Sequence, residues 1–252
     1  MDLNLNNKKV LVTGGSRGIG KGIARVFLEE GANVGVVARG QKGLDEVKQE
    51  FKNIRTYQAD LTEENERIKC MNEFINDFSN IDVLINNSGG SNGGDVLETH
   101  ISTFKEAMEY NYYSAVHFSK LAAQHMLKQQ SGSIINITSI TGRESGGKVT
   151  YNNAKSALIS FTKAFANEAI RYGIRVNSVA PGAIIHLSGA WQKRLDENPE
   201  KINQYIQTNI PAGRFGIVQE VADVVVFLAS EKANWVVGAT LNVDGGQSRS
   251  NF

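Results

Sequence analysis

Cysteine, proline and excess charge are all scarce in this sequence. Cys70 is the single cysteine among 252 residues, so the chain has no internal disulfide and lacks the cysteine framework of small secreted domains. Three prolines are too few to build a Pro-rich linker. The formal net charge is +1, whereas nucleic acids and anionic membranes attract proteins with a concentrated basic face. We therefore expect neither kind of partner.

Long apolar runs are missing as well. No run approaches the roughly 18 apolar residues of a membrane-spanning helix, and the first residues lack the basic and apolar regions of a signal peptide. These absences predict a cytoplasmic protein. Cys70 lies in a helical pattern and is expected to serve packing rather than nucleophilic chemistry. No metal site is expected, because His100, His117 and His125 have no carboxylate or cysteine companions at ligand spacing.

Short apolar runs instead alternate with helical patterns along the whole chain. The predicted strands are residues 8–13, 33–38, 54–58, 81–86, 133–138, 174–178 and 240–243. The predicted helices are residues 19–30, 44–51, 63–78, 102–129, 151–172 and 218–229. Apolar strands that alternate with helices indicate a parallel sheet covered on both faces. We predict an α/β, doubly wound Rossmann fold of about seven strands, with residues 1–252 forming a single domain.

A polar segment that contains Trp191 interrupts the alternation at residues 184–210. It follows a strand end, where ligands bind in open α/β sheets. Two interpretations stay open for it: a substrate-binding lid, or a plain surface helix.

A glycine-rich loop, Thr13-Gly-Gly-Ser-Arg-Gly-Ile-Gly20, joins the first strand to the first helix. Gly14 suits the tight turn, Gly18 lets the backbone approach a pyrophosphate, and Gly20 allows close helix–sheet packing. The helix N-terminus adds free N–H groups and the positive end of a dipole. A lone glycine loop is weak evidence, but the strand–loop–helix context predicts a dinucleotide site.

The end of the second strand bears on the choice of dinucleotide. It reads Val36-Val37-Ala38-Arg39, without the acidic residue that usually binds the ribose of NAD. Arg39 and Arg17 could instead clasp a 2′-phosphate through charge-assisted hydrogen bonds. We therefore expect NADP(H) rather than NAD(H), the alternative being that both arginines are solvated surface charges.

Polar residues also follow the third and fourth strands. Asp60-Leu61 and Asn86-Asn87-Ser88-Gly89 fall at carboxyl ends of strands, where the cofactor would lie. Asp60 could accept a hydrogen bond from the adenine amine, and the Asn-rich turn could brace the sheet and a ribose. Ordinary loop chemistry is the alternative for the turn.

Tyr151 and Lys155 lie four residues apart in a predicted helix, and Ser139 lies twelve residues before Tyr151. Residues at this spacing share one helix face. A cation beside a phenol favours the phenolate, which lowers the phenol pKa towards the range where proton transfer is efficient at neutral pH. The pattern predicts a tyrosine that acts as a general acid or base.

In this order and spacing, these motifs resemble the short-chain dehydrogenase/reductase family over nearly the whole chain. Asn111 and Pro181-Gly182 complete the resemblance. It implies a catalytic tetrad of Asn111, Ser139, Tyr151 and Lys155. Tyr151 would donate a proton to a substrate carbonyl oxygen that Ser139 stabilises. Lys155 would bind the nicotinamide ribose and lower the Tyr151 pKa, and Asn111 would hold a relay water. The cofactor contacts expected are Gly14, Ser16, Arg17, Gly18, Ile19, Gly20, Arg39, Asp60, Leu61, Asn87, Gly89, Tyr151, Lys155, Pro181, Gly182 and Ile184.

The sequence departs from the family pattern in several places. Ser88 stands where the pattern has an alanine, and the interval from Ser139 to Tyr151 is one residue short. Thr138 would restore the common interval, but Ser139 fits the serine motif better. His186 stands where the family often has a threonine that steadies the nicotinamide carboxamide. Ser188 or the backbone of Ile184 could substitute for it.

The expected activity is NADP(H)-dependent reduction of a ketone or aldehyde, or the reverse oxidation, in a homotetramer with a small-molecule substrate. 3-Oxoacyl-carrier-protein reductases are the nearest broad likeness, and there Lys128 and Arg171 would receive an acidic carrier beside the pocket mouth. A catalytically silent dinucleotide-binding regulator is the alternative from another class. Substrate choice is expected to depend on loops at residues 91–97, 143–148 and 184–209.

Overall fold

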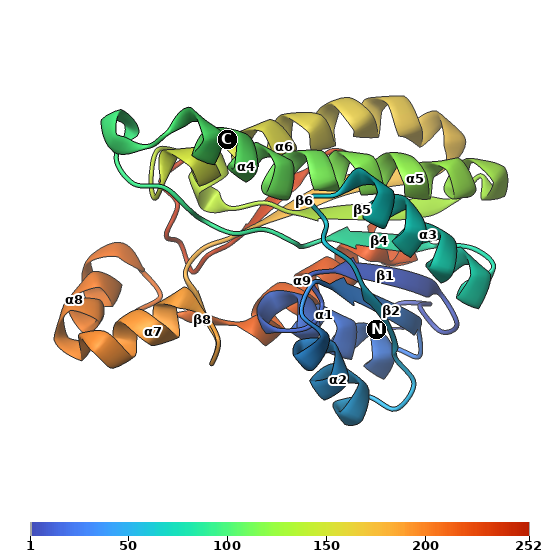
Figure 1. The fold of residues 1–252 in the computed structure, drawn as a ribbon, viewed down its shortest axis with the longest axis horizontal. Helices are drawn as coiled ribbons and strands as arrows, with labels where there is room; N and C mark the ends of the chain where they lie inside the picture. The colour runs from blue at the N-terminus through green and yellow to red at the C-terminus, as the bar shows by residue number, and fades with distance from the viewer. Residues whose placement is uncertain (1, 252) are drawn as a thin grey trace.

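Seven strands form one parallel sheet in the computed structural model, which describes residues 2–251 (Figure 1). Their order across the sheet is β3-β2-β1-β4-β5-β6-β9. Their bounds are β1 (Lys9–Thr13), β2 (Asn33–Ala38), β3 (Arg55–Gln58), β4 (Val83–Asn86), β5 (Gly132–Ile137), β6 (Ile174–Pro181) and β9 (Thr240–Val243). Every position of β4 and β6 is buried, as expected for strands covered on both faces.

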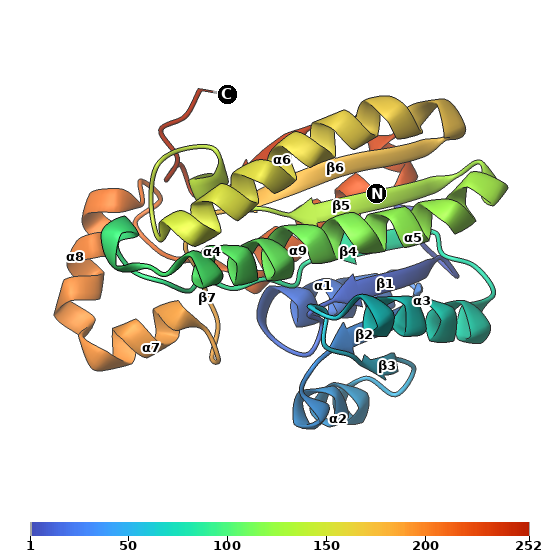
Figure 2. The same ribbon diagram turned by 45° about the horizontal axis from the view of Figure 1, so that its top comes forward.

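Helices cover the two faces of the sheet (Figure 2). α1 (Gly18–Glu29), α2 (Gln41–Glu50) and α9 (Val218–Ala229) pack on one face. α3 (Glu64–Phe78), α5 (Ser114–Gln129) and α6 (Val149–Ala169) pack on the other, where the centre of the core includes Phe74 and Phe118. The predicted Rossmann architecture is confirmed. Among the described residues, no helix is both long and apolar enough to cross a membrane.

Cys70 belongs to the core beneath α3, where its side chain is 1% exposed. Burial raises the pKa of its thiol to about 12, so the thiolate is not formed at neutral pH. The side chain therefore serves packing, as predicted.

The long helix predicted at residues 102–129 is interrupted. α4 (Ile101–Met108) and α5 are joined by a π turn, Glu109–Tyr113. Asn111 lies in this turn, and its amide nitrogen donates to the carbonyl of Ala107, four residues back, at 2.9 Å. π turns insert an extra residue into a helix and often occur at functional sites. Hydrophobic spacing does not reveal such an insertion.

Residues 184–210 form neither a loop nor a single surface helix. β7 (Ile184–Ile185) pairs with β8 (Gly216–Ile217), and between them lie α7 (Ala190–Glu197) and α8 (Pro199–Asn209). We call α7 and α8 the hairpin. Trp191 packs against Tyr205 and Phe215 with tilted rings, whose centroids are 4.8 and 5.2 Å from that of Trp191, so the hairpin has a small core of its own. It projects beyond the carboxyl ends of the strands (Figures 1 and 2).

Candidate active site

The glycine loop lies where the order of strands reverses, between β1 and β4, which is the usual ligand site of such sheets. Gly14 has a positive φ of 64°, and its N–H donates to the carbonyl of Val37 at 2.8 Å. A Cβ on Gly20 would lie 2.4 Å from the Gly14 carbonyl oxygen, so only glycine fits there. Arg17 is the N-cap of α1 and makes no capping hydrogen bond with its side chain. The first N–H groups of α1 thus lie in a cradle that fits a dinucleotide diphosphate. Ser16 and Ile19 belong to the same loop and first turn.

Asn87 braces this loop from the end of β4. Its backbone N–H donates to Thr13 Oγ1 at 2.9 Å, and its Nδ2 donates to the carbonyls of Thr13 and Gly14 at 2.9 and 3.2 Å. Asn87, which is predicted to contact the cofactor, therefore uses its side-chain amide nitrogen to hold the cradle in shape.

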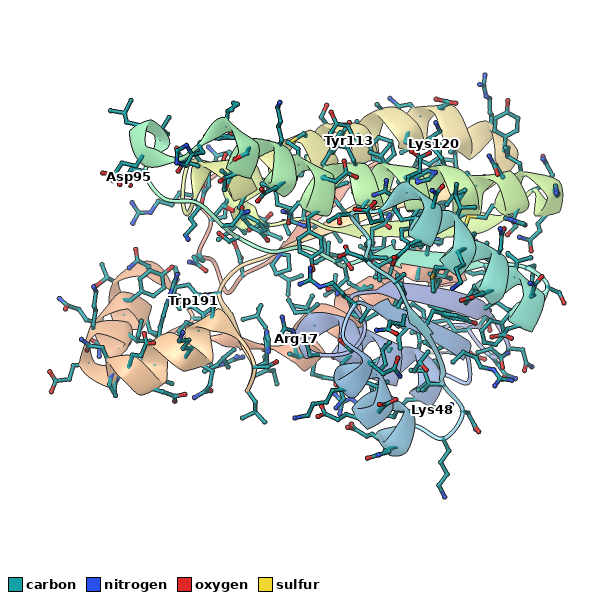
Figure 3. All side chains as sticks on the ribbon, viewed as in Figure 1. Arg17, Lys48, Asp95, Tyr113, Lys120 and Trp191 are labelled. Carbon is teal, nitrogen blue, oxygen red and sulfur yellow. The ribbon has the colours of Figure 1, made fainter. Side chains whose placement is uncertain are left out.

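Arg39 and Asp60 lie together beyond β2 and β3. The guanidinium Nη1 is 3.6 Å from Asp60 Oδ2, and the Arg39 side chain is 81% exposed. Asp60 Oδ1 accepts from the N–H and hydroxyl of Thr62 at 3.0 and 2.8 Å. The Thr62 hydrogen bonds and the nearby Arg39 hold the pKa of Asp60 below its usual value. Arg39 thus retains most of its hydrogen-bonding capacity at the adenosine end of the cradle. Arg17 lies at the start of α1, on the side nearest Trp191 (Figure 3).

Leu61 is buried and offers its backbone to the interior. Its carbonyl accepts from Arg67 Nη1 at 2.7 Å, and the same nitrogen donates to Glu109 in the π turn at 2.8 Å. Arg67 Nε donates to His117 Nδ1 at 3.0 Å. A buried arginine therefore ties the segment after β3 to the turn that carries Asn111.

Ser139, Tyr151 and Lys155 come together where β5 ends and α6 begins. The Ser139 side chain lowers the pKa of the Tyr151 phenol, so the two groups lie near each other, while Ser139 Oγ is 3.0 Å from Thr141 Oγ1. Lys155 Nζ is 5.5 Å from the centroid of the Tyr151 ring and donates to the carbonyl of Ile137 at 2.8 Å. Thr138 points elsewhere, because its hydroxyl donates to the carbonyl of Val179 at 2.9 Å. Ser139, not Thr138, is the hydroxyl beside the phenol.

Asn111 approaches the same place from the π turn. Its Oδ1 accepts from the N–H of Gly90 at 2.9 Å, and its Nδ2 donates to the Gly90 carbonyl at 3.0 Å. A Cβ on Gly89 would lie 2.6 Å from Asn111 Oδ1 and 3.2 Å from Lys155 Nζ. The four predicted tetrad residues therefore gather around one point, although the Asn111 amide is engaged by backbone.

The charge states differ from expectation. Desolvation raises the pKa of Tyr151 to about 12, and the Ser139 hydrogen bond lowers it only in part. Desolvation also lowers the pKa of Lys155 to about 8. The expectation that Lys155 lowers the Tyr151 pKa is wrong, because the ammonium is directed at the Ile137 carbonyl and burial is the largest cause of the pKa shift of both groups.

The short interval between Ser139 and Tyr151 is closed by residues that the sequence did not single out. Asn152 Nδ2 donates to the carbonyls of Thr141, Glu144 and Gly146, the last two at 2.9 and 3.4 Å. Ser156 Oγ donates to the carbonyl of Gly142 at 2.8 Å. Asn152 and Ser156 lie four apart and share a helix face, which is the signal that could have identified them.

Pro181 and Gly182 end β6 against the C-terminal segment. The Gly182 N–H donates to the Val243 carbonyl at 3.0 Å, and the Ala183 N–H donates to Gln247 Oε1 at 2.9 Å. Gln247 also donates to the Tyr205 hydroxyl of α8 at 2.8 Å. Ile184 is buried and begins β7. The C-terminal segment therefore fixes the base of the hairpin, a role that no sequence motif indicated.

Lys128 and Arg171 do not lie beside the active-site residues. Both are exposed near the C-terminal ends of α5 and α6, whereas Tyr151 lies at the N-terminal end of α6. Twenty helical residues at about 1.5 Å each separate Arg171 from Tyr151 by about 30 Å. The expectation that Lys128 and Arg171 flank the mouth of the pocket in their own chain is therefore wrong.

Comparisons with known proteins agree with this geometry. The family model described as enoyl-(acyl carrier protein) reductase matches residues 14–248. The 3-oxoacyl-[acyl-carrier-protein] reductase of Chlamydia pneumoniae is 35% identical over 251 residues, covering 98% of this chain and 99% of that protein. The same reductase of Thermotoga maritima is 30% identical over 249 residues, covering 97% and 99%.

A solved structure extends the likeness to a ligand-bound protein. The 7α-hydroxysteroid dehydrogenase complexed with NADH and 7-oxo glycochenodeoxycholic acid has a TM-score of 0.90 and 30% identity, covering 99% of this chain and 97% of that one. The chain belongs to the short-chain dehydrogenase/reductase family and is an oxidoreductase that acts on a CH–OH group with NAD(P).

Proposed function

We propose that this protein is a cytoplasmic, NADP(H)-dependent carbonyl reductase that converts a ketone or aldehyde to an alcohol, or catalyses the reverse. In this proposal residues 1–252 form one catalytic domain, and the hairpin with its flanking strand β7, residues 184–210, closes over the substrate as a lid. The observation that carries the proposal is the approach of Lys155 to the Tyr151 ring, at 5.5 Å from its centroid, with Ser139 near enough to act on the phenol.

The tetrad divides the chemistry among its members. The Tyr151 phenol is protonated at neutral pH because its pKa is raised to about 12, so it can donate a proton to a carbonyl oxygen in the reductive direction. The Ser139 hydroxyl donates a hydrogen bond to the same oxygen as negative charge develops there. Oxidation requires the phenolate, which an ammonium turned towards Tyr151 would favour.

The cradle and Lys155 would hold the cofactor, whose nicotinamide supplies or accepts the hydride when bound. Gly14, Gly18 and Gly20 let the backbone approach the diphosphate. Lys155 exchanges its contact with Ile137 for the ribose hydroxyls. Ser16, Ile19, Asp60, Leu61, Asn87, Gly89, Pro181, Gly182 and Ile184 line the remaining length of the proposed site.

Asn111 serves the relay by shaping the π turn. Its side-chain amide is occupied by Gly90 and Ala107, so in this proposal the backbone of the π turn, and not that amide, holds the relay water near Lys155. Protons taken from Tyr151 are then replaced from solvent through this water and the lysine.

The preference for NADP(H) rests on Arg39 and Arg17. Arg39 is exposed beyond β2 and its pairing with Asp60 is loose, so a 2′-phosphate with nearly two negative charges can recruit it. The residue at the end of β2 is a cation instead of the acidic residue that would repel the phosphate, and the nearby Asp60 carboxylate is paired with that cation.

Tyr151→Phe tests the activity. Assayed against a panel of carbonyl compounds with NADPH, the variant should lose turnover by at least about a hundredfold, the usual contribution of a positioned acid or base. NADPH binding, followed by fluorescence, should survive because the phenol is not a phosphate ligand. Retained turnover would exclude Tyr151 as proton donor. A wild-type protein that binds NADPH but reduces no compound of the panel would favour a dinucleotide-binding regulator.

Reduction of a 3-oxoacyl group on a carrier protein is the second candidate, and the named relatives favour it. The positions of Lys128 and Arg171 at the far ends of their helices mean that a carrier would have to reach the site of a neighbouring subunit. The same 3-oxoacyl group should be offered on a carrier protein and on a small thiol. A KM that is much lower for the carrier-linked form would support this candidate.

A homotetramer is part of the proposal. Support comes from apolar side chains exposed on α5 and its π turn, such as Tyr113 at 50%, and from Trp235 at 99% and Leu241 at 37% beside the edge strand β9. Large exposed apolar surfaces mark interaction sites. A monomer by light scattering at micromolar concentration would contradict this assembly.

A further inference from the structure

His186 lies between β7 and α7, and its imidazole ring touches two glycines. A Cβ on Gly18 would lie 2.8 Å from the ring Cε1 and 2.9 Å from Nε2. A Cβ on Gly189 would lie 2.8 Å from Nε2. Gly18 is the first residue of α1 in the cradle, and Gly189 is the N-cap of α7 in the hairpin. The ring is therefore the physical link between the phosphate cradle and the start of the hairpin.

One edge of this ring is left for a ligand. Nδ1 lies 3.3 Å from the hydroxyl of Ser188. Within residues 2–251, Ser188 is the only group in hydrogen-bond distance of the imidazole, so Nε2 has no protein partner. Nε2 lies within 2.9 Å of the Cβ position of both glycines, at the N-terminus of α1 where free N–H groups and the helix dipole favour an anion.

The surroundings of His186 lower the pKa of its ring and so favour the neutral imidazole. Burial, and then the positive charge of Arg17, lower the pKa of His186. Arg17 is the charged group of the described residues that acts on the ring, and the hairpin contributes the uncharged Ser188 and Gly189 on its other side. An anion placed between Arg17 and the ring would reverse this balance and raise the pKa.

We infer that Nε2 of His186 donates a hydrogen bond to the diphosphate of the dinucleotide, and that this contact draws the start of the hairpin onto the bound cofactor. The inference rests on the proposed function, because it requires a dinucleotide in the cradle. In this inference His186 contacts the diphosphate, whereas the threonine that the family often has at this position steadies the nicotinamide carboxamide. It also makes cofactor affinity increase as pH falls, since the protonated ring binds the diphosphate best.

ADP-ribose is the probe that tests this contact. It carries the diphosphate but neither the nicotinamide carboxamide nor a 2′-phosphate, whose own titration near pH 6 would obscure that of the ring. Binding to the full chain is measured by isothermal titration calorimetry at pH 6 and pH 8, in two buffers with different ionisation enthalpies. Wild type, His186→Gln and His186→Ala are compared, with His125→Gln on α5 as the matched control.

The expected result has three parts. Wild type and His125→Gln bind ADP-ribose more tightly at pH 6 than at pH 8 and take up protons on binding. His186→Gln and His186→Ala bind about tenfold more weakly at pH 6, the size of one hydrogen bond to a charged group, and lose most of the proton uptake. ADP-ribose protects Lys193 and Arg194 of α7 from trypsin in wild type but not in His186→Gln.

Other outcomes overturn the inference in recognisable ways. Equal affinities and equal proton uptake in wild type and His186→Gln would exclude the contact while leaving the proposed function intact. Tighter binding by His186→Ala would show that the ring obstructs the site instead of serving it. A wild-type protein that binds ADP-ribose at neither pH would overturn the proposed dinucleotide site together with this inference.

Discussion

Lys155 lies 5.5 Å from the centre of the Tyr151 ring, yet its ammonium donates to the carbonyl of Ile137 at 2.8 Å instead of to the phenol. The side chain is 2% exposed, and desolvation lowers its pKa to about 8. The fold therefore holds a buried cation that a single carbonyl stabilises only in part. Such a group lowers the stability of the fold in order to serve a ligand.

We predict that Lys155→Met stabilises the cofactor-free protein at pH 7. The folded-state pKa is about 8 against an ordinary 10.5, so the charged form is disfavoured by burial below pH 8. After allowing for the lost Ile137 hydrogen bond, the free energy of unfolding should rise by about 2 kcal/mol. Between pH 8 and 10.5 Lys155 is protonated in the unfolded chain but not in the folded one, so the free energy of unfolding of wild type should rise with pH. The stability difference between Lys155→Met and wild type should therefore shrink in this range. Urea denaturation of both proteins at pH 7 and within the range from pH 8 to 10.5 measures this stability difference. Lys120→Met, which alters an exposed lysine of α5, should show neither effect.

Arg39→Ala should separate the two dinucleotides. The Arg39 side chain is 81% exposed, and its ion pair with Asp60 is loose, at 3.6 Å. Its removal should therefore disturb little of the fold. Loss of a charge-assisted contact should weaken NADPH binding by about tenfold and leave NADH binding nearly unchanged. Fluorescence titration gives the dissociation constants of NADPH and NADH for wild type and Arg39→Ala, and these constants test the prediction. Arg55→Ala removes an exposed arginine of β3 paired with Asp77 and should bind both cofactors like wild type. Equal losses for NADPH and NADH in Arg39→Ala would contradict the NADP(H) preference.

Asn152→Ala should loosen the loop between Ser139 and Tyr151. The amide of Asn152 donates to three carbonyls of that loop, and alanine offers no donor. We expect trypsin to cut after Arg143 or Lys148 at least several-fold faster, and kcat to fall by about tenfold as Ser139 loses its position. The exposed neighbour supplies the control, because Asn153→Ala leaves the loop contacts in place. Unchanged proteolysis in Asn152→Ala would show that the loop is held by other contacts.

Arg67→Met should destabilise the protein by about 3 kcal/mol, because it leaves partners of a buried arginine without a donor. The Arg67 side chain is 6% exposed and donates to Leu61, Glu109 and His117. The midpoint of urea unfolding measures the change. Lys69→Met breaks only an exposed pair with Glu73 on the same helix and should alter stability by less than about 0.5 kcal/mol. A near-neutral Arg67→Met would mean that water replaces these contacts.

The order and type of the sheet elements could be predicted because their signals are local. Strand β6 is apolar over most of its length and α1 carries helical spacing, so burial and periodicity agree there. The cluster of Ser139, Tyr151 and Lys155 could be placed together for the same reason, since a strand end and a helix start bring them within one loop of each other.

The remainder depends on contacts between distant residues. Asn111 of the π turn bonds to Gly90, 21 residues away, and no periodicity contains that pair. Gln247 fixes the base of the hairpin from 64 positions away in the chain. The raised pKa of Tyr151 reflects how thoroughly the fold removes water, whereas helical spacing alone suggested the neighbouring lysine would dominate.

The packing of Trp191 against Tyr205 and Phe215 provides an intrinsic optical probe. The sequence has two tryptophans, and the other, Trp235, is 99% exposed in the segment before β9. Replacing Trp235 with phenylalanine leaves one indole whose emission reports only on the hairpin. Movement of this segment during turnover then becomes visible in real time without an attached dye, whichever substrate proves to be the natural one.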